Sequence, residues 1–211
     1  MTAGSTRSDV RQRYGALVDC IADLLGPSAE VVLHDVSRTD HSVVLIRNGL
    51  VTGRSVGAPL TDLGFYMLRE SDRRIETLGV YYSQAGNGKR LKCNAANLRD
   101  SRGKVEAILC INIDVTDEAS AEGQERSSPF TEHYETSIRR VIDTLVRHAT
   151  EGRGRELSAE AKVEVVRALE SRGVFLARGA IKQVAASLGI APPTVYKYIQ
   201  QVRHTRALSA R

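Results

Sequence analysis

The sequence predicts an α+β protein, in which a five-stranded antiparallel sheet with flanking helices precedes a C-terminal all-α domain. Five runs rich in β-branched residues lie before residue 116, and turn signals such as Asn48-Gly49 separate them. Later in the chain, apolar residues recur with a helical period. The balance of acidic and basic residues also differs between these two parts of the chain. Residues 1–125 carry 15 Lys and Arg against 17 Asp and Glu, whereas residues 126–211 carry 15 against 8.

The N-terminal part should begin with a helix from about Ser8 to Leu25, which Gly26 and Pro27 end. The expected strands are residues 30–37, 42–49, 78–85, 90–99 and 105–115, with a short extended piece at 50–57. A helix is expected at 61–70 with Thr61 as its cap, and a short helix or loop at 72–77. The last three strands should form a meander. The strand at 105–115 is almost continuously apolar, so it should be central, with the helices on one face of the sheet.

The C-terminal part should follow a polar linker at residues 117–130. A long helix is expected at 131–149, with Tyr134 in its apolar stripe, and a second at 158–171, capped by Ser158. Two more helices are expected at 180–188 and 192–202. The predicted domains are therefore a sensor-like domain at 8–118, a linker and connecting helix at 119–152, and an all-α domain at 153–211.

The last two helices have the spacing of a helix-turn-helix, in which the second helix enters the major groove of DNA. Gly189 suits the tight turn between them. The buried stripes would be Ile181, Val184, Ala185 and Leu188 on the first helix, and Val195, Tyr198, Ile199 and Val202 on the second. An ordinary helical hairpin in a globular core has the same pattern. The sequence has no Asp or Glu after Glu170, which favours a phosphate backbone as the partner.

The predicted partner is therefore double-stranded DNA. Lys197 and Arg203, with Lys182 or Arg178, would hold phosphates. The residues predicted to point outward from the second helix are Pro193, Thr194, Tyr196, Lys197 and Gln200, of which the first four would face bases. One such motif covers only a few base pairs, so a homodimer is expected. The sheet and the helix at 131–149 are its predicted interfaces.

Polar residues embedded in the apolar strands and their connections predict a site for a small polar effector. The candidate ligand-binding residues are His34, Asp35, Asn48, Arg54, Thr61, Asp62, Asn112 and Asp114. The alternative is that they only satisfy one another. Asp35 or Asp62 would then pair with Arg54, Asn48 would bond within its turn, and His34 would bond a backbone carbonyl.

Catalysis has little support, so the chain is predicted not to be an enzyme. His34 and Asp35 are adjacent, and on a strand they would point to opposite faces. The sequence has no G-x-S-x-G, H-E-x-x-H or phosphate-loop motif, and nothing in it points to haem, flavin or another cofactor. A second hypothesis is a small-molecule-binding protein whose basic tail docks another partner such as RNA. A third is a protein–protein module without a ligand.

Cys20, Cys93 and Cys110 form no C-x-x-C pair, so neither a metal site nor a disulfide is predicted. They are expected as reduced thiols, two of them in strands, with redox sensing as the alternative. No apolar run approaches the ~20 residues that cross a bilayer, and the N-terminus lacks the apolar core of a signal peptide. A cytoplasmic protein that does not enter the membrane is therefore expected.

Both parts of the sequence also resemble known families. Residues 13–118 are similar to the YheO-like PAS domain through GPSAEVVLHDVS, HSVVLIRNGLVTGRSVGAPLTDLG and ILCINIDVTD. Residues 158–203 resemble the DauR-type helix-turn-helix through KVEVVRALESRGVFLARGAIKQVAASLGI and TVYKYIQ. The resemblance implies a bacterial transcriptional regulator with a PAS-like sensor. One departure is Ala191-Pro192-Pro193, where such motifs commonly open the second helix with a serine.

Overall fold

The computed structural model describes residues 6–73, 75–118, 130, 132–153 and 157–209 of the chain. Its five strands form one antiparallel sheet in the order β2-β1-β5-β4-β3. The strands are β1 (Ala29–Asp35), β2 (Val43–Arg47), β3 (Tyr81–Gln84), β4 (Arg90–Arg99) and β5 (Val105–Asp114). The predicted meander is confirmed, and the apolar strand β5 lies in the centre.

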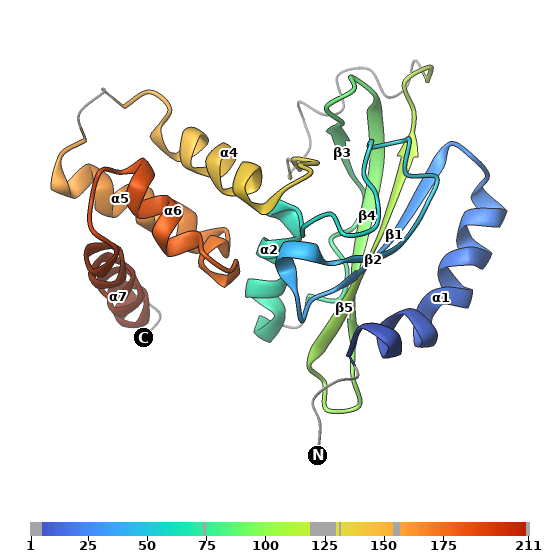
Figure 1. Ribbon diagram of the computed structural model, residues 1–211, viewed down its shortest axis with the longest axis horizontal. Helices are drawn as coiled ribbons and strands as arrows, with labels where there is room; N and C mark the ends of the chain where they lie inside the picture. The colour runs from blue at the N-terminus through green and yellow to red at the C-terminus, as the bar shows by residue number, and fades with distance from the viewer. Residues whose placement is uncertain (1–5, 74, 119–129, 131, 154–156, 210–211) are drawn as a thin grey trace.

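Two helices of this part lie on opposite faces of the sheet (Figure 1). Helix α1 (Thr6–Leu25) packs on β1 and β2 through a cluster that includes Val18, Val31 and Leu33. Helix α2 (Asp62–Arg69) lies on the other face, which we call the inner face. The expectation that all helices cover one face was therefore wrong. Val31 and Leu33 of β1 are buried on one face of the sheet and Val32 on the other, so helices must pack on both faces.

Four helices follow: α4 (Ile138–Thr150), α5 (Ala159–Ser171), α6 (Ala180–Ser187) and α7 (Pro192–Ser209). Short 3-10 turns occur at Thr39–His41, Glu70–Arg73 and Val174–Leu176. Ser158 caps α5 as predicted, since its hydroxyl accepts a hydrogen bond from the Ala161 amide at 3.2 Å. The predicted linker lies mostly outside the described residues.

Two sequence expectations about elements were wrong. Residues 50–57 form turns rather than an extended piece. Helix α4 begins at Ile138, where Ser137 caps it, instead of at residue 131. Tyr134 therefore does not belong to the apolar stripe of α4; it packs with the sensor residues Tyr81 and Leu91. A polar segment before the cap carries this tyrosine back to the sheet.

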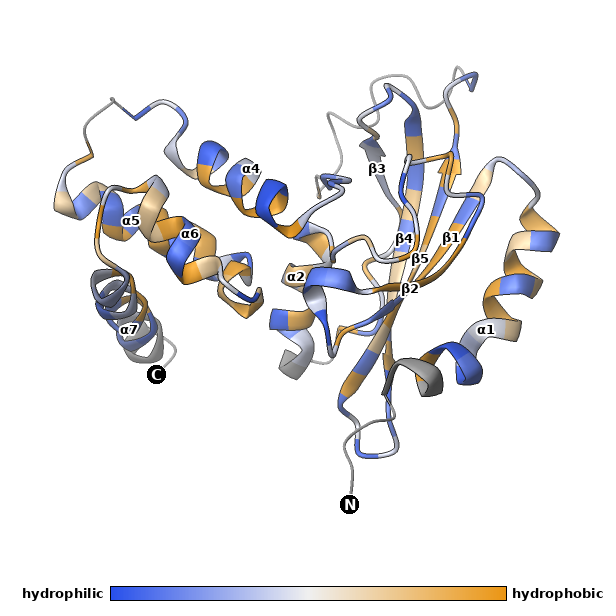
Figure 2. Cartoon of the chain, viewed as in Figure 1, coloured by the Kyte–Doolittle hydropathy of each residue, from blue (hydrophilic) through white to orange (hydrophobic). Residues whose placement is uncertain are grey.

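Helix α4 joins the two halves of the molecule. Its residues Val141, Ile142 and Leu145 belong to the same apolar cluster as Phe65 of α2 and Val184 of α6 (Figure 2). On its other side, Gln183 of α6 donates hydrogen bonds to the Arg139 carbonyl and the Asp143 carboxylate. The core is thus continuous from the inner face of the sheet to the helical part. Among the described helices, none is long and apolar enough to span a membrane.

Candidate DNA-binding helix and sensor site

Helices α6 and α7 meet at a tight turn with the geometry that the sequence predicted. Gly189 has a left-handed φ of 61°, and the Ile190 amide donates back to the Ala185 carbonyl at 3.0 Å. The Thr194 amide donates to the Ala191 carbonyl at 2.9 Å, so α7 starts without a side-chain cap. Pro192 suits this first turn because its missing N–H would have no partner there.

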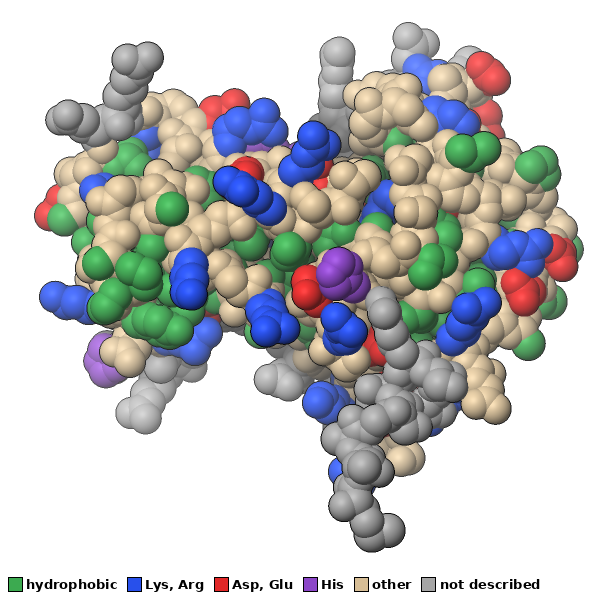
Figure 3. Space-filling model, viewed as in Figure 1, with side chains coloured by type: hydrophobic (Ala, Val, Ile, Leu, Met, Phe, Trp, Pro, Cys, Tyr) green, Lys and Arg blue, Asp and Glu red, His purple; other side chains and the backbone are tan. Residues whose placement is uncertain are grey.

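Helix α7 has one buried and one exposed side. Val195, Ile199 and Val202 are buried, whereas Tyr196 keeps 56% of its surface exposed. The other residues predicted to contact DNA are exposed, namely Lys182, Pro193, Lys197, Gln200 and Arg203, apart from the half-buried Thr194. Lys and Arg outnumber Asp and Glu over the helical part in the view of Figure 3. The sequence-predicted DNA-binding residues therefore lie where a duplex can reach them.

Arg203 has a partner within the chain that the sequence did not reveal. Its Nε donates to Glu170 Oε1 at 2.7 Å, and Glu170 is buried at the end of α5. Much of the Arg203 charge is thus balanced before any phosphate arrives. We expect Lys197 to contribute more to phosphate binding than Arg203.

The inner face of the sheet carries a buried polar cluster. Glu30 of β1 accepts hydrogen bonds from the Thr52 hydroxyl at 2.6 Å and from the Asn112 amide at 3.0 Å. Glu30 and Asn112 are paired neighbours on β1 and β5, so their side chains point to the same face. Burial raises the pKa of the Glu30 carboxyl, although the hydrogen bonds oppose that rise. The Asn112 side-chain oxygen has no partner among the described residues.

Arg54 is the buried cation nearest this cluster. It is 5% exposed and donates one hydrogen bond to the Pro59 carbonyl, while its Nε has no partner within the described part of the chain. Its charge acts on Glu30 and on Glu132, and in each case it lowers the pKa of the carboxyl. Arg54 therefore offsets part of the cost of burying two carboxylates, and their own hydrogen bonds offset more.

Glu132 reaches the inner face from the segment that leads into α4. The hydroxyls of Tyr81 and Tyr134 both donate to its Oε2, at 2.6 and 3.0 Å. The nearby Thr61 hydroxyl also helps to lower the pKa of this carboxyl. Burial raises the pKa of the Glu132 carboxyl, and its hydrogen bonds lower it. A segment distant in sequence thus inserts its carboxylate among sensor residues.

His133 fixes the next residue of the same segment to α2. Its backbone N–H donates to Asp62 Oδ1 at 2.9 Å, and its ring Nδ1 lies 2.6 Å from Asp62 Oδ2. The ring also packs against His148 of α4 in a tilted arrangement, with 4.7 Å between ring centroids. The hydrogen bond to Asp62 raises the pKa of His133. Burial and the neighbouring His133 lower the pKa of His148.

The structure brings together only part of the predicted ligand-binding set. Arg54, Thr61, Asp62 and Asn112 lie on or beside the inner face, as does His34, which bonds the Ser42 hydroxyl at 2.8 Å. Burial and the charge of Arg54 hold the pKa of His34 well below its usual value, so the ring is neutral.

Three predicted residues lie elsewhere. Asn48 donates to the carbonyls of Gly26 and Ala29 and so fixes the turn between α1 and β1. Asp114 accepts from Thr116 and pairs with Lys89 at the end of the sheet. Asp35 alternates with His34, so it points away from the inner face.

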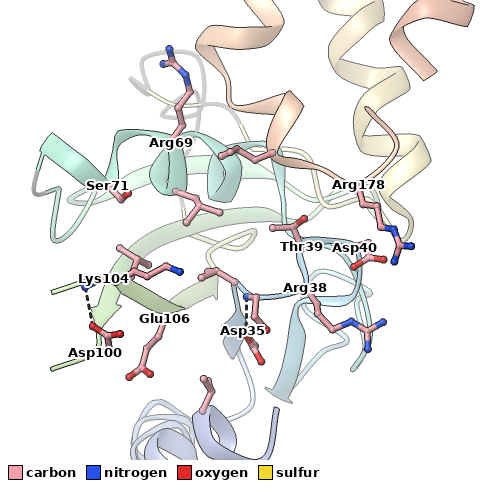
Figure 4. A pocket seen from close by; sticks show the side chains of 16 residues that line it. Asp35, Arg38, Thr39, Asp40, Arg69, Ser71, Asp100, Lys104, Glu106 and Arg178 are labelled. Atoms are coloured by element: carbon pink, nitrogen blue, oxygen red, sulfur yellow. Dashed lines mark hydrogen bonds between the residues drawn. The ribbon is translucent and has the colours of Figure 1, made fainter. Parts of the chain in front are cut away.

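Asp35 instead lines a separate groove of about 790 Å³ between the sensor and the helical part (Figure 4). One Asp35 oxygen accepts from the Ser37 amide at 2.8 Å, and the other has no partner among the described residues. The charged residues around this groove include Arg38, Asp40, Arg69, Lys104, Glu106 and Arg178.

Comparison with family models and with curated relatives places the chain in a family. A family model for the YheO-like PAS domain matches residues 5–125, and a model for an HTH domain matches residues 141–200. The chain belongs to the YheO-like PAS family. The predicted resemblance and fold class are thereby confirmed.

Relatives of this YheO-like protein extend over nearly the whole chain. It is 31% identical over 208 residues to "Uncharacterized protein YheO" of Escherichia coli K12, covering 94% of this chain and 87% of the relative. It is 30% identical to "Transcriptional regulator DauR" of Pseudomonas aeruginosa, covering 91% of this chain and 94% of that relative. The solved structure of the phage VqmA-DPO complex is 15% identical with a TM-score of 0.34, covering 92% of this chain and 83% of that chain. A likeness at that level carries no functional argument.

The pairings weighed from the sequence were wrong in this YheO-like sensor. Arg54 pairs directly with neither Asp35 nor Asp62, since it donates to the Pro59 carbonyl and Asp62 is bonded to His133. His34 bonds a hydroxyl rather than a backbone carbonyl. Asn48 bonds the preceding turn rather than its own. In each case the true partner is distant in sequence or belongs to a loop.

Sequence reasoning missed four residues that build the inner site: Glu30, Thr52, Tyr81 and Glu132. Glu30 carried a signal, because it alternates with Val32 and His34 on one face of a β-branched run. Glu132 carried none, because it follows a polar linker. The three cysteines are free. Burial raises the pKa of Cys93 and Cys110, which disfavours their thiolate forms.

The contact between His133 and Asp62 should make stability depend on pH. Because the pKa of His133 is raised in the folded chain, its charged form stabilises the fold below the unfolded value of about 6.5. This contribution is lost as the pH rises through the folded value. We expect the wild type to exceed His133→Asn in stability at pH 6 and the gap to narrow by pH 8.5, as measured by urea unfolding. A gap that is the same at both pH values would contradict this assignment.

Proposed function

We propose that this protein is a DNA-binding regulator of transcription, rather than an enzyme, in which the PAS-like part responds to a small polar effector. The observation that carries the DNA-binding part is the two-sided α7, where Tyr196 and Lys197 are exposed beside the buried Val195 and Ile199. The helix follows a tight turn after α6, which is the arrangement that places a helix in the major groove.

Charge supports the same proposal. The helical part holds the excess of Lys and Arg, whereas the sensor is nearly balanced. Lys182 and Lys197 are exposed, and neither forms an ion pair with another described residue. Lysines near the start of α6 and in the first half of α7 suit two phosphate contacts.

Replacing Lys197 by alanine should weaken binding to a duplex selected from a random DNA pool. The expected rise in Kd is about tenfold, and the slope of log Kd against log salt should fall by about one. Fluorescence anisotropy at several salt concentrations measures both quantities. Lys92→Ala is the matched control, because Lys92 is an exposed lysine on β4 of the sensor.

An unchanged Kd and salt slope for Lys197→Ala would remove α7 from the interface. Single-stranded RNA of the same length should compete less well than the selected duplex. If RNA competes better, the basic part docks RNA instead, as the second sequence hypothesis held.

The effector part of the proposal is supported by the polar inner face. Arg54 and Asn112 are buried, yet each leaves one polar atom without a partner among the described residues. Buried polar atoms without a partner are costly, and a bound molecule would satisfy them. The inner face also connects directly to α4 through residues 132–135.

We also propose a homodimer that forms through the α1 side of the sensor. Leu17, Leu24 and Leu25 of α1 are 46%, 84% and 39% exposed. A second copy would cover these leucines and would supply the second half-site. Leu24→Glu should convert the dimer to a monomer in light scattering, while the circular dichroism spectrum stays unchanged. A wild type that is monomeric at concentrations that saturate DNA would refute the dimer.

A further inference from the structure

We propose that the inner face of the sheet is a binding site for small carboxylate-bearing molecules, and that Glu132 of the chain itself occupies it as an internal stand-in for the effector. An arriving carboxylate would take the place of Glu132 and release the segment that leads to α4. This inference rests on the proposed effector response for its regulatory consequence, but the site itself does not depend on it.

The first support is the set of hydrogen-bond donors that meet at one carboxylate. The Tyr81 and Tyr134 hydroxyls lie 2.6 and 3.0 Å from the same oxygen of Glu132, and the nearby Thr61 hydroxyl helps to lower the pKa of its carboxyl. Tyr81 and Thr61 belong to the sensor. Two neutral donors that remain when Glu132 leaves could therefore bind the carboxylate of another molecule in the same way.

The second support is the charge that Arg54 holds beside these donors. Its guanidinium is 5% exposed, and it makes one hydrogen bond, to a carbonyl, with Nε left without a partner among the described residues. A guanidinium that still has a free N–H in a buried site is a strong partner for a carboxylate. The charge of Arg54 lowers the pKa of Glu132, but among the described residues Arg54 and Glu132 do not form an ion pair.

The third support concerns the rest of the effector. The side-chain oxygen of Asn112 is buried and has no partner within the described residues, and Glu30 lies beside it. Asn112 pairs with Glu30 on one side and with Cys93 on the other, and Cys93 pairs with Tyr81, so these side chains point to the same face of the sheet. Tyr81 bonds Glu132, so the two carboxylates lie at opposite ends of one row of residues. A molecule with a carboxylate at one end and an N–H or O–H donor at the other would satisfy Arg54 and Asn112 together.

A purely structural role for Glu132 explains less. Removing a carboxylate from water is costly, and apolar side chains of similar volume often stabilise a core as well or better. Glu132 is 4% exposed, and burial raises its pKa, which records that cost. The buried Glu132 carboxylate costs free energy where it lies. A ligand carboxylate that binds the same donors more favourably could therefore displace it.

Release of Glu132 would change the contacts that position the helical part. The next residue, His133, links Asp62 of α2 to His148 of α4. Helix α4 in turn bonds α6 through Gln183, and α6 positions α7. A carboxylate effector would therefore act on the DNA-binding helix through three consecutive contacts, from His133 to α4, from α4 to α6 and from α6 to α7, without any change in the sheet.

The test replaces the internal carboxylate by an added one. Glu132→Ala leaves the donors in place and opens room for acetate. In full-length Glu132→Ala, sodium acetate should raise the melting temperature by about 3 °C or more over sodium chloride at the same ionic strength and pH 7. This rise corresponds to acetate at roughly ten times its Kd.

The wild type should show no such rise, because Glu132 fills the site. Glu135→Ala is the matched control, since it removes a nearby carboxylate that bonds Thr144 of α4 instead of the sheet. Equal melting temperatures of Glu132→Ala in acetate and chloride would overturn the proposal, as would an equal acetate effect in Glu135→Ala.

If Glu132→Ala does not fold in either salt, Glu132→Gln decides. The glutamine keeps the side-chain volume but carries no charge, so acetate should displace it and again raise the melting temperature. The absence of an acetate effect in Glu132→Gln would overturn the proposal. DNA affinity is measured separately in both salts. An acetate effect on melting without one on DNA affinity would keep the site and refute its regulatory link.

Discussion

Replacing Arg54 by methionine should lower the free energy of unfolding by about 1–3 kcal/mol at pH 8, because the Pro59 carbonyl loses its donor and two buried carboxylates lose a nearby positive charge. Arg54 is the buried cation that lowers the pKa of both Glu30 and Glu132. Without it, two carboxylates stay in the core with hydrogen bonds but no opposite charge. Methionine fills much of the same volume, so the loss reports the missing charge rather than a cavity.

The loss in Arg54→Met should shrink as the pH falls. Burial already raises the folded pKa of Glu30 and Glu132, and the removal of Arg54 raises both further. Carboxyls with raised folded pKa values bind protons more tightly in the folded state, so they cost stability at high pH and not below their unfolded value near 4.3. Urea unfolding followed by circular dichroism at pH 5 and pH 8 checks this trend.

Arg47→Met is the control for that experiment. Arg47 pairs with Asp19 and Asp23 at 2.6 and 2.7 Å, but these contacts lie on the surface. The expected loss is small, because exposed ion pairs contribute little to stability. If Arg54→Met cost no more than this control, the buried carboxylates would not depend on Arg54 for their charge balance.

Replacing Gly173 by alanine should lower stability by roughly 2–4 kcal/mol and loosen the contact between the helical part and the sensor. Gly173 follows α5 with a left-handed φ of 74°, and a Cβ there would lie 2.5 Å from the Phe65 carbonyl oxygen of α2. The oxygen belongs to the backbone of a packed helix, so it cannot move away cheaply. The Arg69 side chain, which bonds the Ser171 carbonyl, closes the same contact.

Gly179→Ala separates the cost of the left-handed backbone from the cost of the clash with Phe65. Gly179 has a similar φ of 82°, but a Cβ there would meet nothing within 4 Å. It should cost only the ~1 kcal/mol of the left-handed backbone. Thermal unfolding and limited proteolysis between residues 132 and 180 compare the variants. Equal losses for both would mean that α2 and the Gly173 turn do not form a close contact in solution.

The elements with strong local patterns were predictable from the sequence. Strand β4 was predicted at residues 90–99 and has those bounds, because turns on both sides and alternating burial mark it. Helix α5 and its Ser158 cap followed from a local hydrogen-bond rule. The exposure of Tyr196 and Lys197 followed from the apolar stripe of α7, since a helix that buries one side must expose the other.

The partners of buried polar groups were not predictable in this way. Arg54 was recognised as a candidate, but its neighbours come from β1, the loop before α2 and the segment after the linker. The position of α1 on the opposite face of the sheet from α2 also has no local signature.

The sequence by itself therefore determined most of the helices and strands, the order of the strands that follow one another through tight turns, and the basic, two-sided helix α7. Only the tertiary structure decided that Glu132 enters the inner face and that Gly173 touches Phe65. The reason is physical. Periodicity and caps depend on residues within one or two turns of each other, whereas the placement of a buried charge depends on groups that only the folded chain brings together.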